Sequence, residues 1–213
     1  YLGTFSKILS AGLRLGWAVA PAPVLAKMNM GKQGADLCSS SLTQHFVAQY
    51  FREGRWESYL DSLKRLYRGR RDTLLGALAE HFPAEATWTE PQGGLFVWAT
   101  LPDFLDTTDL LARALQRNVA FVPGRGAYMD GRGGSSMRLN FSGVNDAEIR
   151  EGVRRIGEVI GEQVELFGTL TGARPAVSEP PAPAVSAPDS ELADVLHLPR
   201  TPRPDAQRSD GRS

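Results

Sequence analysis

Lys7 is the residue of this sequence that is best suited to covalent chemistry. Thr4 and Ser6 come just before it, and Arg14 follows seven positions later. A lysine amine can form an imine with an aldehyde, whereas hydroxyl groups and the planar fork of an arginine can bind a phosphate. An aldehyde cofactor that carries a phosphate needs both kinds of group. These residues therefore indicate a site for pyridoxal phosphate.

The elements expected around Lys7 are short. One strand should end at Phe5 and the next should cover residues 14–20, with Lys7 in the loop between them. Pro23 can open a helix. The expected apolar face of this helix consists of Val24, Leu25 and Met28. Residues 32–41 are predicted to be a loop that leads to a second helix.

A long helix is predicted from about Trp56 to Phe82, because its apolar residues recur at helical spacing. Five basic residues fall on its polar side: Lys64, Arg65, Arg68, Arg70 and Arg71. Acidic residues lie among them, and we interpret this basic cluster as a solvated helix face.

After the long helix the pattern changes to short β-type runs that alternate with helices. The order β-β-α-β-β-α between Thr87 and Phe167 predicts a compact α+β unit with helices on one face of a small sheet. Within it, residues 119–122 are expected to form a strand and Asn145 to cap the last helix. Residues 173–213 hold eight of the fourteen prolines, a composition typical of a disordered tail.

Composition and charge limit the class of protein. The chain has 24 basic and 24 acidic residues, so no overall field favours nucleic acid or an anionic membrane. Cys38 is the only cysteine, which excludes an internal disulfide and fits a reducing, cytosolic setting; we expect it to be buried. No apolar run approaches the ~20 residues that span a bilayer, and the three histidines lack metal-ligand spacing. We interpret the start, which has no methionine, as an internal cut.

Five blocks of the sequence resemble one family in the same order. Thr4-Phe-Ser-Lys7 with Gly12-Leu-Arg14-Leu-Gly16 is similar to the lysine motif of fold-type I, class I/II aminotransferases, which use pyridoxal phosphate. The bacterial subgroup of 2-aminoadipate and broad-range amino-acid aminotransferases is the most similar. The other four blocks are Gln33–Asp36, Gln92–Trp98, Val119–Gly124 and Met137–Ser142.

The resemblance implies an α/β fold, namely the C-terminal portion of a fold-type I transferase. Residues 1–55 would be the end of the large domain that binds pyridoxal phosphate, and residues 56–85 the interdomain helix. Residues 86–168 would be the small C-terminal α+β domain, followed by a disordered, proline-rich tail over 169–213.

The resemblance also implies roles for the residues around Lys7. Lys7 would form the Schiff base with the cofactor and, once freed, move the proton of the substrate. Arg14 would bind the cofactor phosphate with the help of the hydroxyls of Thr4 and Ser6, and Gly12 would allow a tight turn. The structural alternatives are a surface lysine, an arginine paired with an acidic neighbour, and ordinary turn hydroxyls.

Arg138 matches the arginine that binds the substrate α-carboxylate in this family. An arginine in an apolar strand is costly unless it meets an anion, and the alternative is a buried ion pair with a protein carboxylate. Asn140 falls on the same face and could orient it. Gly93 and Gly94 would approach the substrate, although a glycine turn before a strand is an equal alternative.

Three further residues are weaker candidates. Gln33 could line the site, or be an ordinary loop residue. Tyr128 and Arg125 could shape a side-chain pocket, while the glycine-rich stretch 131–134 indicates a mobile loop.

The function implied is amino transfer from an amino acid to a 2-oxo acid. The alternative is an aminotransferase-like effector domain of a winged-helix transcriptional regulator, since such proteins share the Lys7 and Arg14 blocks; the Arg138 strand and the Gln92–Gly94 turn favour the enzyme. A third possibility is that this piece does nothing by itself, because the family places the residues that contact the cofactor ring upstream of Tyr1. Expressed alone, it is then expected to bind pyridoxal phosphate poorly and to turn over no substrate.

The partners implied are amino acid and 2-oxo acid substrates and a second copy of the chain in a homodimer. A cytoplasmic location is expected, with no membrane contact. Nucleic acid is a partner only under the regulator alternative.

Overall fold

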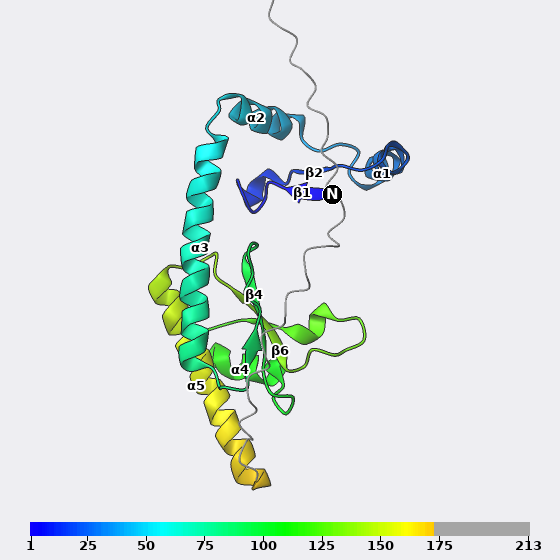
Figure 1. Ribbon diagram of the computed structural model, residues 1–213. Helices are drawn as coiled ribbons and strands as arrows, with labels where there is room; N and C mark the ends of the chain where they lie inside the picture. Colours follow the sequence, from blue (N-terminus) through cyan, green and yellow to red (C-terminus); the bar gives the residue numbers. More distant parts are fainter. Residues whose placement is uncertain (173–213) are drawn as a thin grey trace, which may run out of the picture. The chain divides into compact units, whose positions relative to one another are not determined.

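The N-terminal region, residues 1–52, consists of a two-stranded hairpin and two helices. The computed structural model describes residues 1–172 of the chain (Figure 1). The elements of this region are β1 (Leu2–Thr4), the short helix η1 (Ala11–Leu13), β2 (Gly16–Ala18), α1 (Ala22–Ala35) and α2 (Ser41–Arg52). Strands β1 and β2 are antiparallel, and Gly3 lies opposite Trp17. A side chain at Gly3 would collide with the Trp17 indole, so this close pairing needs glycine.

Several expectations for the N-terminal region are wrong. Gln33 lies in α1 rather than in a loop, because the helix continues to Ala35. Cys38 is exposed rather than buried. The helix expected to open at Pro23 is confirmed as α1, and its apolar residues Val24, Leu25 and Met28 are 49%, 40% and 43% exposed. No residue of α1 is buried within the described chain.

The long helix predicted from the sequence is confirmed as α3 (Trp56–His81). Its second half carries the buried residues Leu74, Ala77 and Leu78, which join the hydrophobic core. Helix α3 lies beside the last helix of the described chain, α5 (Asp146–Thr171), as Figure 1 shows. Gly157 of α5 faces the His81 carbonyl at the end of α3, where a side chain would collide with the backbone.

The sheet region, residues 87–172, has the predicted order β-β-α-β-β-α. Its elements are β3 (Thr87–Trp88), β4 (Phe96–Thr100), α4 (Thr107–Gln116), β5 (Val122–Pro123), the short helix η2 (Gly124–Ala127), β6 (Ser136–Asn140) and α5. The strand expected over 119–122 is wrong in its bounds, because β5 begins only at Val122. Before it, Asn118 has a left-handed backbone and the Val119 amide donates to the Ala114 carbonyl of α4. The sheet order is β3-β4-β6-β5, and all neighbours are antiparallel.

The two faces of this sheet differ, as period-two alternation requires. Val97 and Ala99 of β4, and Met137 and Leu139 of β6, are buried in the core with residues of α3, α4 and α5. The opposite face carries Phe96, Trp98, Arg138 and Asn140, none of which is buried. The helices therefore cover one face, as predicted, and leave the other open.

Caps define the ends of the helices in the sheet region. Asn145 accepts the amide of Glu148, whose carboxylate accepts the amide of Asn145, which makes a capping box and confirms the predicted cap. Helix α5 ends at Thr171, three residues past the domain end predicted at residue 168, and the left-handed Gly172 caps it.

The predicted disordered tail, from residue 173 onward, lies outside the described residues. Among the described helices, none is long and apolar enough to cross a membrane.

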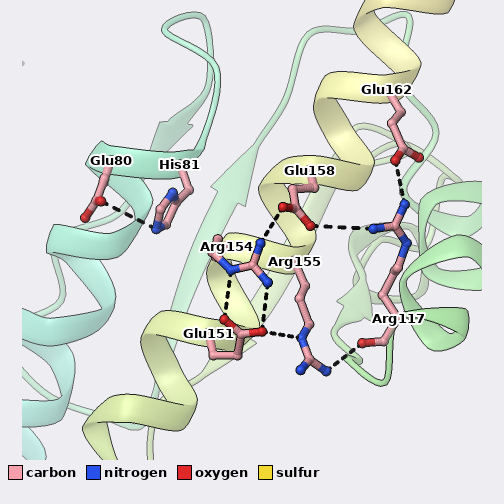
Figure 2. Close-up of polar contacts among 8 residues, drawn as sticks. All are labelled: Glu80, His81, Arg117, Glu151, Arg154, Arg155, Glu158 and Glu162. Atoms are coloured by element: carbon pink, nitrogen blue, oxygen red, sulfur yellow. Dashed lines mark hydrogen bonds and ion pairs between the residues drawn. The ribbon is translucent and has the colours of Figure 1, made fainter.

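A network of ion pairs covers the outer surface of α5. Figure 2 shows Glu151 between Arg154 and Arg155, at 2.8 Å and 2.7 Å. Arg117 reaches from the end of α4 to Glu158 at 3.5 Å and Glu162 at 2.6 Å. The hydrogen bonds from Arg154 and then Arg155 lower the pKa of Glu151 from 4.5 to about 2.

Candidate functional site

The lysine loop, residues 5–15, brings together the groups predicted to bind a phosphate. Arg14 Nη1 donates to the Ser6 hydroxyl oxygen at 3.3 Å and to the Ala11 carbonyl at 3.2 Å. The Ser6 amide donates to the Thr4 hydroxyl at 3.1 Å. Within residues 1–172, Arg14 forms no ion pair, so the alternative of an acidic partner finds no support there. Three polar side chains thus converge, and the positive charge of Arg14 is left available.

The turn that aims Arg14 is in an unusual conformation. Arg14 has φ 48° and ψ 37°, the left-handed region that costs a residue with a side chain on the order of 1–3 kcal/mol. The sequence placed the tight turn at Gly12, but Gly12 has no positive φ, and a side chain there would make only an ordinary contact with the Ser10 hydroxyl oxygen, at 3.8 Å. The strained backbone therefore lies at Arg14 itself, the residue predicted to bind the phosphate, and such strain is found often at binding sites.

Lys7 lies in the same loop with its side chain exposed. Its apolar neighbours Phe5, Ile8 and Leu9 are half-buried, and the Phe5 ring meets Phe51 of α2 at 5.7 Å. The sequence disfavoured a surface lysine, kept as an alternative, because these neighbours do not form a solvated face. Within residues 1–172 the Lys7 side chain is nevertheless exposed, and its catalytic role stays a prediction. Its amine forms no hydrogen bond or ion pair there and is free to react.

Arg138 lies on the open face of the sheet rather than in the interior. It is directly opposite Trp98 of β4 and Val122 of β5. Its guanidinium lies over the Phe96 ring, 4.3 Å from the centroid. Within the described residues it meets no carboxylate, so a buried ion pair is not what Arg138 forms there.

Asn140 shares the open face but does not bond to Arg138. Its side-chain oxygen accepts the Ser142 amide at 2.6 Å and the Ser142 hydroxyl at 2.8 Å. Asn140 therefore fixes the chain that leaves β6. Within residues 1–172 no hydrogen bond or ion pair joins Arg138 to the residues of the lysine loop.

The turn before β4 contains Gly93 and Gly94. Gly94 has φ 80°, a conformation that glycine adopts without cost. A side chain at either glycine would meet nothing within 4 Å. Packing within the described chain therefore does not require Gly93, and its surface is free for another molecule.

The segment after β5 is more closely packed than the sequence indicated. The Tyr128 ring lies against Gly133, where a side chain would stand 2.6 Å from it, and the Gly134 carbonyl accepts the Thr107 amide at 2.8 Å. The stretch 131–134 is therefore packed at Gly133 and Gly134, while Gly131 has open space around it; its expected mobility stays a prediction. Tyr128 meets Trp98 edge to face at 6.0 Å, so it borders the open face of the sheet.

Arg125 is engaged elsewhere, since it donates to Asp106 at 2.6 Å. The pKa of Asp106 is lowered, chiefly by the hydrogen bond from the Thr108 amide and then by Arg125. Within the described residues Arg125 therefore pairs with Asp106, the N-cap residue of α4, and its predicted part in a side-chain pocket stays a prediction.

Two arginines near the open face were not recognised from the sequence. Arg70 donates to the Ser142 carbonyl at 2.6 Å, and Arg71 donates to the Pro91 carbonyl at 3.0 Å. The interpretation of the basic cluster as a solvated face is therefore wrong for these two residues. Their half-buried position on the border of the apolar stripe, next to Thr73 and Leu74, was the available signal.

Comparison with known proteins gives the family of the chain. The family model of aminotransferase class I and II matches residues 1–156. The chain is 41% identical to aromatic-amino-acid aminotransferase 1 of Thermococcus litoralis over 165 residues, 78% of this chain and 40% of that protein. The structure of the α-aminoadipate aminotransferase of Thermus thermophilus, complexed with N-(5′-phosphopyridoxyl)-L-leucine, is 41% identical. It has a TM-score of 0.74 over 78% of this chain and 42% of that chain.

The described fold is that of fold-type I transferases, as predicted from the sequence. The chain belongs to the aminotransferases of class I and II. It spans about two-fifths of the length of the curated relatives that it matches first. It is also 32% identical to the uncharacterized HTH-type transcriptional regulator YdfD of Bacillus subtilis, over 76% of this chain and 33% of the regulator.

Proposed function

We propose that the protein is an aminotransferase that uses pyridoxal phosphate to move an amino group from an amino acid to a 2-oxo acid. The observation that carries the proposal is the lysine loop, in which Arg14, without an ion-pair partner in residues 1–172, meets the Ser6 hydroxyl beside the free amine of Lys7. Membership of the family and 41% identity to an aromatic-amino-acid aminotransferase support it.

The residues of the lysine loop fit the cofactor. A guanidinium and hydroxyls are the donors that a phosphate needs, and Arg14 and Ser6 supply them. The Thr4 hydroxyl, which donates to the Leu15 carbonyl at 3.4 Å, would have to turn toward the phosphate to join them. Lys7 Nζ would hold the aldehyde carbon. When bound, pyridoxal phosphate supplies an electron-withdrawing ring that makes the Cα proton of an attached amino acid acidic. Lys7 Nζ, once released, would accept that proton and return it at a neighbouring carbon.

Arg138 would bind the α-carboxylate of the substrate. Its guanidinium is stacked on Phe96 and has no carboxylate partner in residues 1–172, so its donors remain available for a bidentate contact. The open environment of Gly93 and Gly94 supports an approach of the substrate to the turn before β4.

The predicted partners and location belong to the same proposal. Amino acids and 2-oxo acids are the expected substrates, the working form is expected to be a homodimer, and a cytoplasmic location fits a chain with one cysteine. The domain bounds at residues 55, 85 and 168 also remain proposals. Sedimentation of the complete protein would test the dimer.

The decisive experiment replaces Lys7. The complete protein is loaded with pyridoxal phosphate and mixed with an amino acid, and the change in cofactor absorbance and the transfer to a 2-oxo acid are recorded. Lys7→Ala should lower the rate roughly 10³-fold or more, because both the anchor and the base are lost. The matched control is Lys27→Ala, which removes an exposed lysine of α1. Equal activity in Lys7→Ala and the wild type would refute the proposal.

Replacement of Arg14 and replacement of Arg138 should impair different steps, cofactor binding and substrate binding. Arg14→Ala should weaken binding of pyridoxal phosphate, measured by equilibrium titration, whereas the exposed Arg52→Ala should not. Arg138→Met should lower kcat/KM on the order of 10²-fold for every amino acid, since all share the α-carboxylate, and should leave cofactor binding unchanged.

The regulator alternative is less supported. Identity to the regulator is 32%, compared with 41% to the aminotransferase from Thermococcus litoralis. A protein that binds pyridoxal phosphate through Lys7, retards a DNA fragment from its own promoter and transfers no amino group would reverse this ranking.

A further inference from the structure

Two consecutive arginines of α3 contact two loops that lie far from each other in the sequence. Arg70 Nη1 donates to the Ser142 carbonyl at 2.6 Å, across 72 positions, and Arg71 Nη1 donates to the Pro91 carbonyl at 3.0 Å, across 20 positions. Both acceptors are backbone carbonyls, so what these bonds hold is the path of the main chain. The remaining members of the basic cluster are exposed.

The two loops leave the same end of the sheet. Strand β4 is antiparallel to β6 with Phe96 opposite Asn140, so the turn before Phe96 lies beside the segment after Asn140. The Phe141 amide extends this pairing with a bond of 3.3 Å to the Leu95 carbonyl. One loop contains Gly93 and Gly94, and the other follows the strand that carries Arg138.

Arg71 is arranged to act as a fixed donor. Its side chain is only 20% exposed, and its Nε and Nη2 both donate to Asp72, at 2.9 Å and 2.7 Å. These two bonds fix the plane of the guanidinium, which directs Nη1 at Pro91. A bond from a charged donor to a carbonyl is stronger than one between neutral groups. Asp72 therefore orients Arg71, and Arg71 orients the turn.

The path from Arg71 continues to the carboxylate-binding group. The turn held at Pro91 leads directly into Phe96, and the Phe96 ring supports the Arg138 guanidinium at 4.3 Å. A displacement of the turn would move this ring and the guanidinium above it. Arg70 holds the other loop, so both segments that flank the open face at this end are tied to one helix.

We propose that Arg70 and Arg71 are positioning residues that hold the two loops so that Arg138 and the Gly93–Gly94 backbone present a fixed surface to the substrate carboxylate. The inference deepens the proposed function and rests on it. The arginines act through the loops and touch neither substrate nor cofactor.

The first test is independent of catalysis. Amide hydrogen exchange is measured by mass spectrometry in the complete protein for Arg70→Gln, Arg71→Gln and the matched control Arg68→Gln, an exposed arginine of the same helix. Arg71→Gln should accelerate exchange roughly tenfold in residues 91–96, and Arg70→Gln in residues 141–145, while the control changes neither. Unchanged exchange in both loops would overturn the inference.

The second test separates positioning from a merely structural role. Arg71→Gln should raise KM for the amino acid and for the 2-oxo acid about 5- to 10-fold by similar factors, with kcat changed less, because the carboxylate contact is affected and the chemistry is not. Arg71→Lys keeps the charge and should restore part of the loss. Faster exchange combined with an unchanged KM would show that the arginines only stabilise the loops and would refute the positioning role.

The two tests distinguish failure of the proposed aminotransferase function from failure of the positioning role of Arg70 and Arg71. If the wild-type protein transfers no amino group, the proposed function fails, and the exchange data still decide whether the arginines hold the loops. If the wild type is active and KM does not respond to Arg71, only the further inference fails.

Discussion

The N-terminal region and the sheet region are held together in different ways. In residues 1–52 only Val47 is buried, and the hairpin is maintained by backbone hydrogen bonds and by ring contacts such as Tyr1 with Trp17 at 5.3 Å. The sheet region packs one face of its sheet against α3, α4 and α5, and α5 alone buries six residues.

This difference separates the groups proposed to bind the cofactor from the groups that provide stability. Lys7 and Arg14 are positioned by a turn and by local hydrogen bonds, so truncating an apolar side chain near them removes little packing within the described residues. Arg138 is positioned by a strand whose alternate residues are in the core. The lysine loop is thus built locally, whereas the position of Arg138 depends on the core, and the two groups of proposed site residues should respond differently to mutation.

Leu78→Ala is the sharpest test of this contrast and should have the largest effect. Leu78 of α3 is fully buried in the hydrophobic core. Its truncation should lower the free energy of unfolding of the chain by about 2–5 kcal/mol. Leu25→Ala in α1, where the side chain is 40% exposed, should cost less than about 1 kcal/mol. Urea unfolding followed by circular dichroism measures both. Equal losses would show that α1 is as well packed as α3 and would remove the contrast.

The same contrast explains what the sequence could predict. Helical spacing over residues 56–82 and the cap at Asn145 depend on neighbours in the chain, and both were predicted correctly. The convergence of Thr4, Ser6 and Arg14 is also local, since it lies within one loop. Local chemistry was sufficient for these features.

Features that depend on distant partners were missed. Nothing near Arg71 in the sequence indicates that it meets the Pro91 carbonyl, and a polar helix position is equally compatible with solvent. The exposure of Cys38 and of the apolar face of α1 depends on which segments cover them, which spacing cannot show. Gly133 looked like part of a mobile stretch, although the Tyr128 ring fills the space beside it.

Gly157→Ala should have the next largest effect, because it probes a close contact between α5 and the end of α3. A methyl group at this position would collide with the His81 carbonyl, so α5 must shift and the protein should lose about 1–3 kcal/mol. The matched control is Gly161→Ala in the same helix, which has open space and should gain up to about 1 kcal/mol from helix propensity. Thermal unfolding that moves the same way in both variants would contradict the close contact.

Asn145→Ala should cost about 1 kcal/mol, since it removes the acceptor for the Glu148 amide at the start of α5. The N-terminal region should not respond, because its helices have separate caps, such as Ser40 for α2. Hydrogen exchange in residues 146–150 should therefore rise more than in residues 41–45. A similar rise in both segments would mean that the two regions unfold together.

The smallest expected effect is a loss of unfolding free energy at low pH, when the ion pairs of α5 are weakened. The pKa of Glu151 is lowered from 4.5 to about 2 by hydrogen bonds from Arg154 and then Arg155. Because the folded pKa lies below the unfolded one, the contribution of Glu151 is complete above pH 4.5 and is lost as the pH falls toward about 2. The contribution of Glu151 to the free energy of unfolding is small because the paired groups are exposed to solvent.

Glu151→Gln should reduce the loss of unfolding free energy in this pH interval, measured by urea titrations at a series of pH values. Glu165→Gln, a substitution of an exposed glutamate on the same helix without an ion-pair partner in residues 1–172, should not. An identical acid response in Glu151→Gln and the wild type would show that the network in Figure 2 does not contribute to the stability of α5.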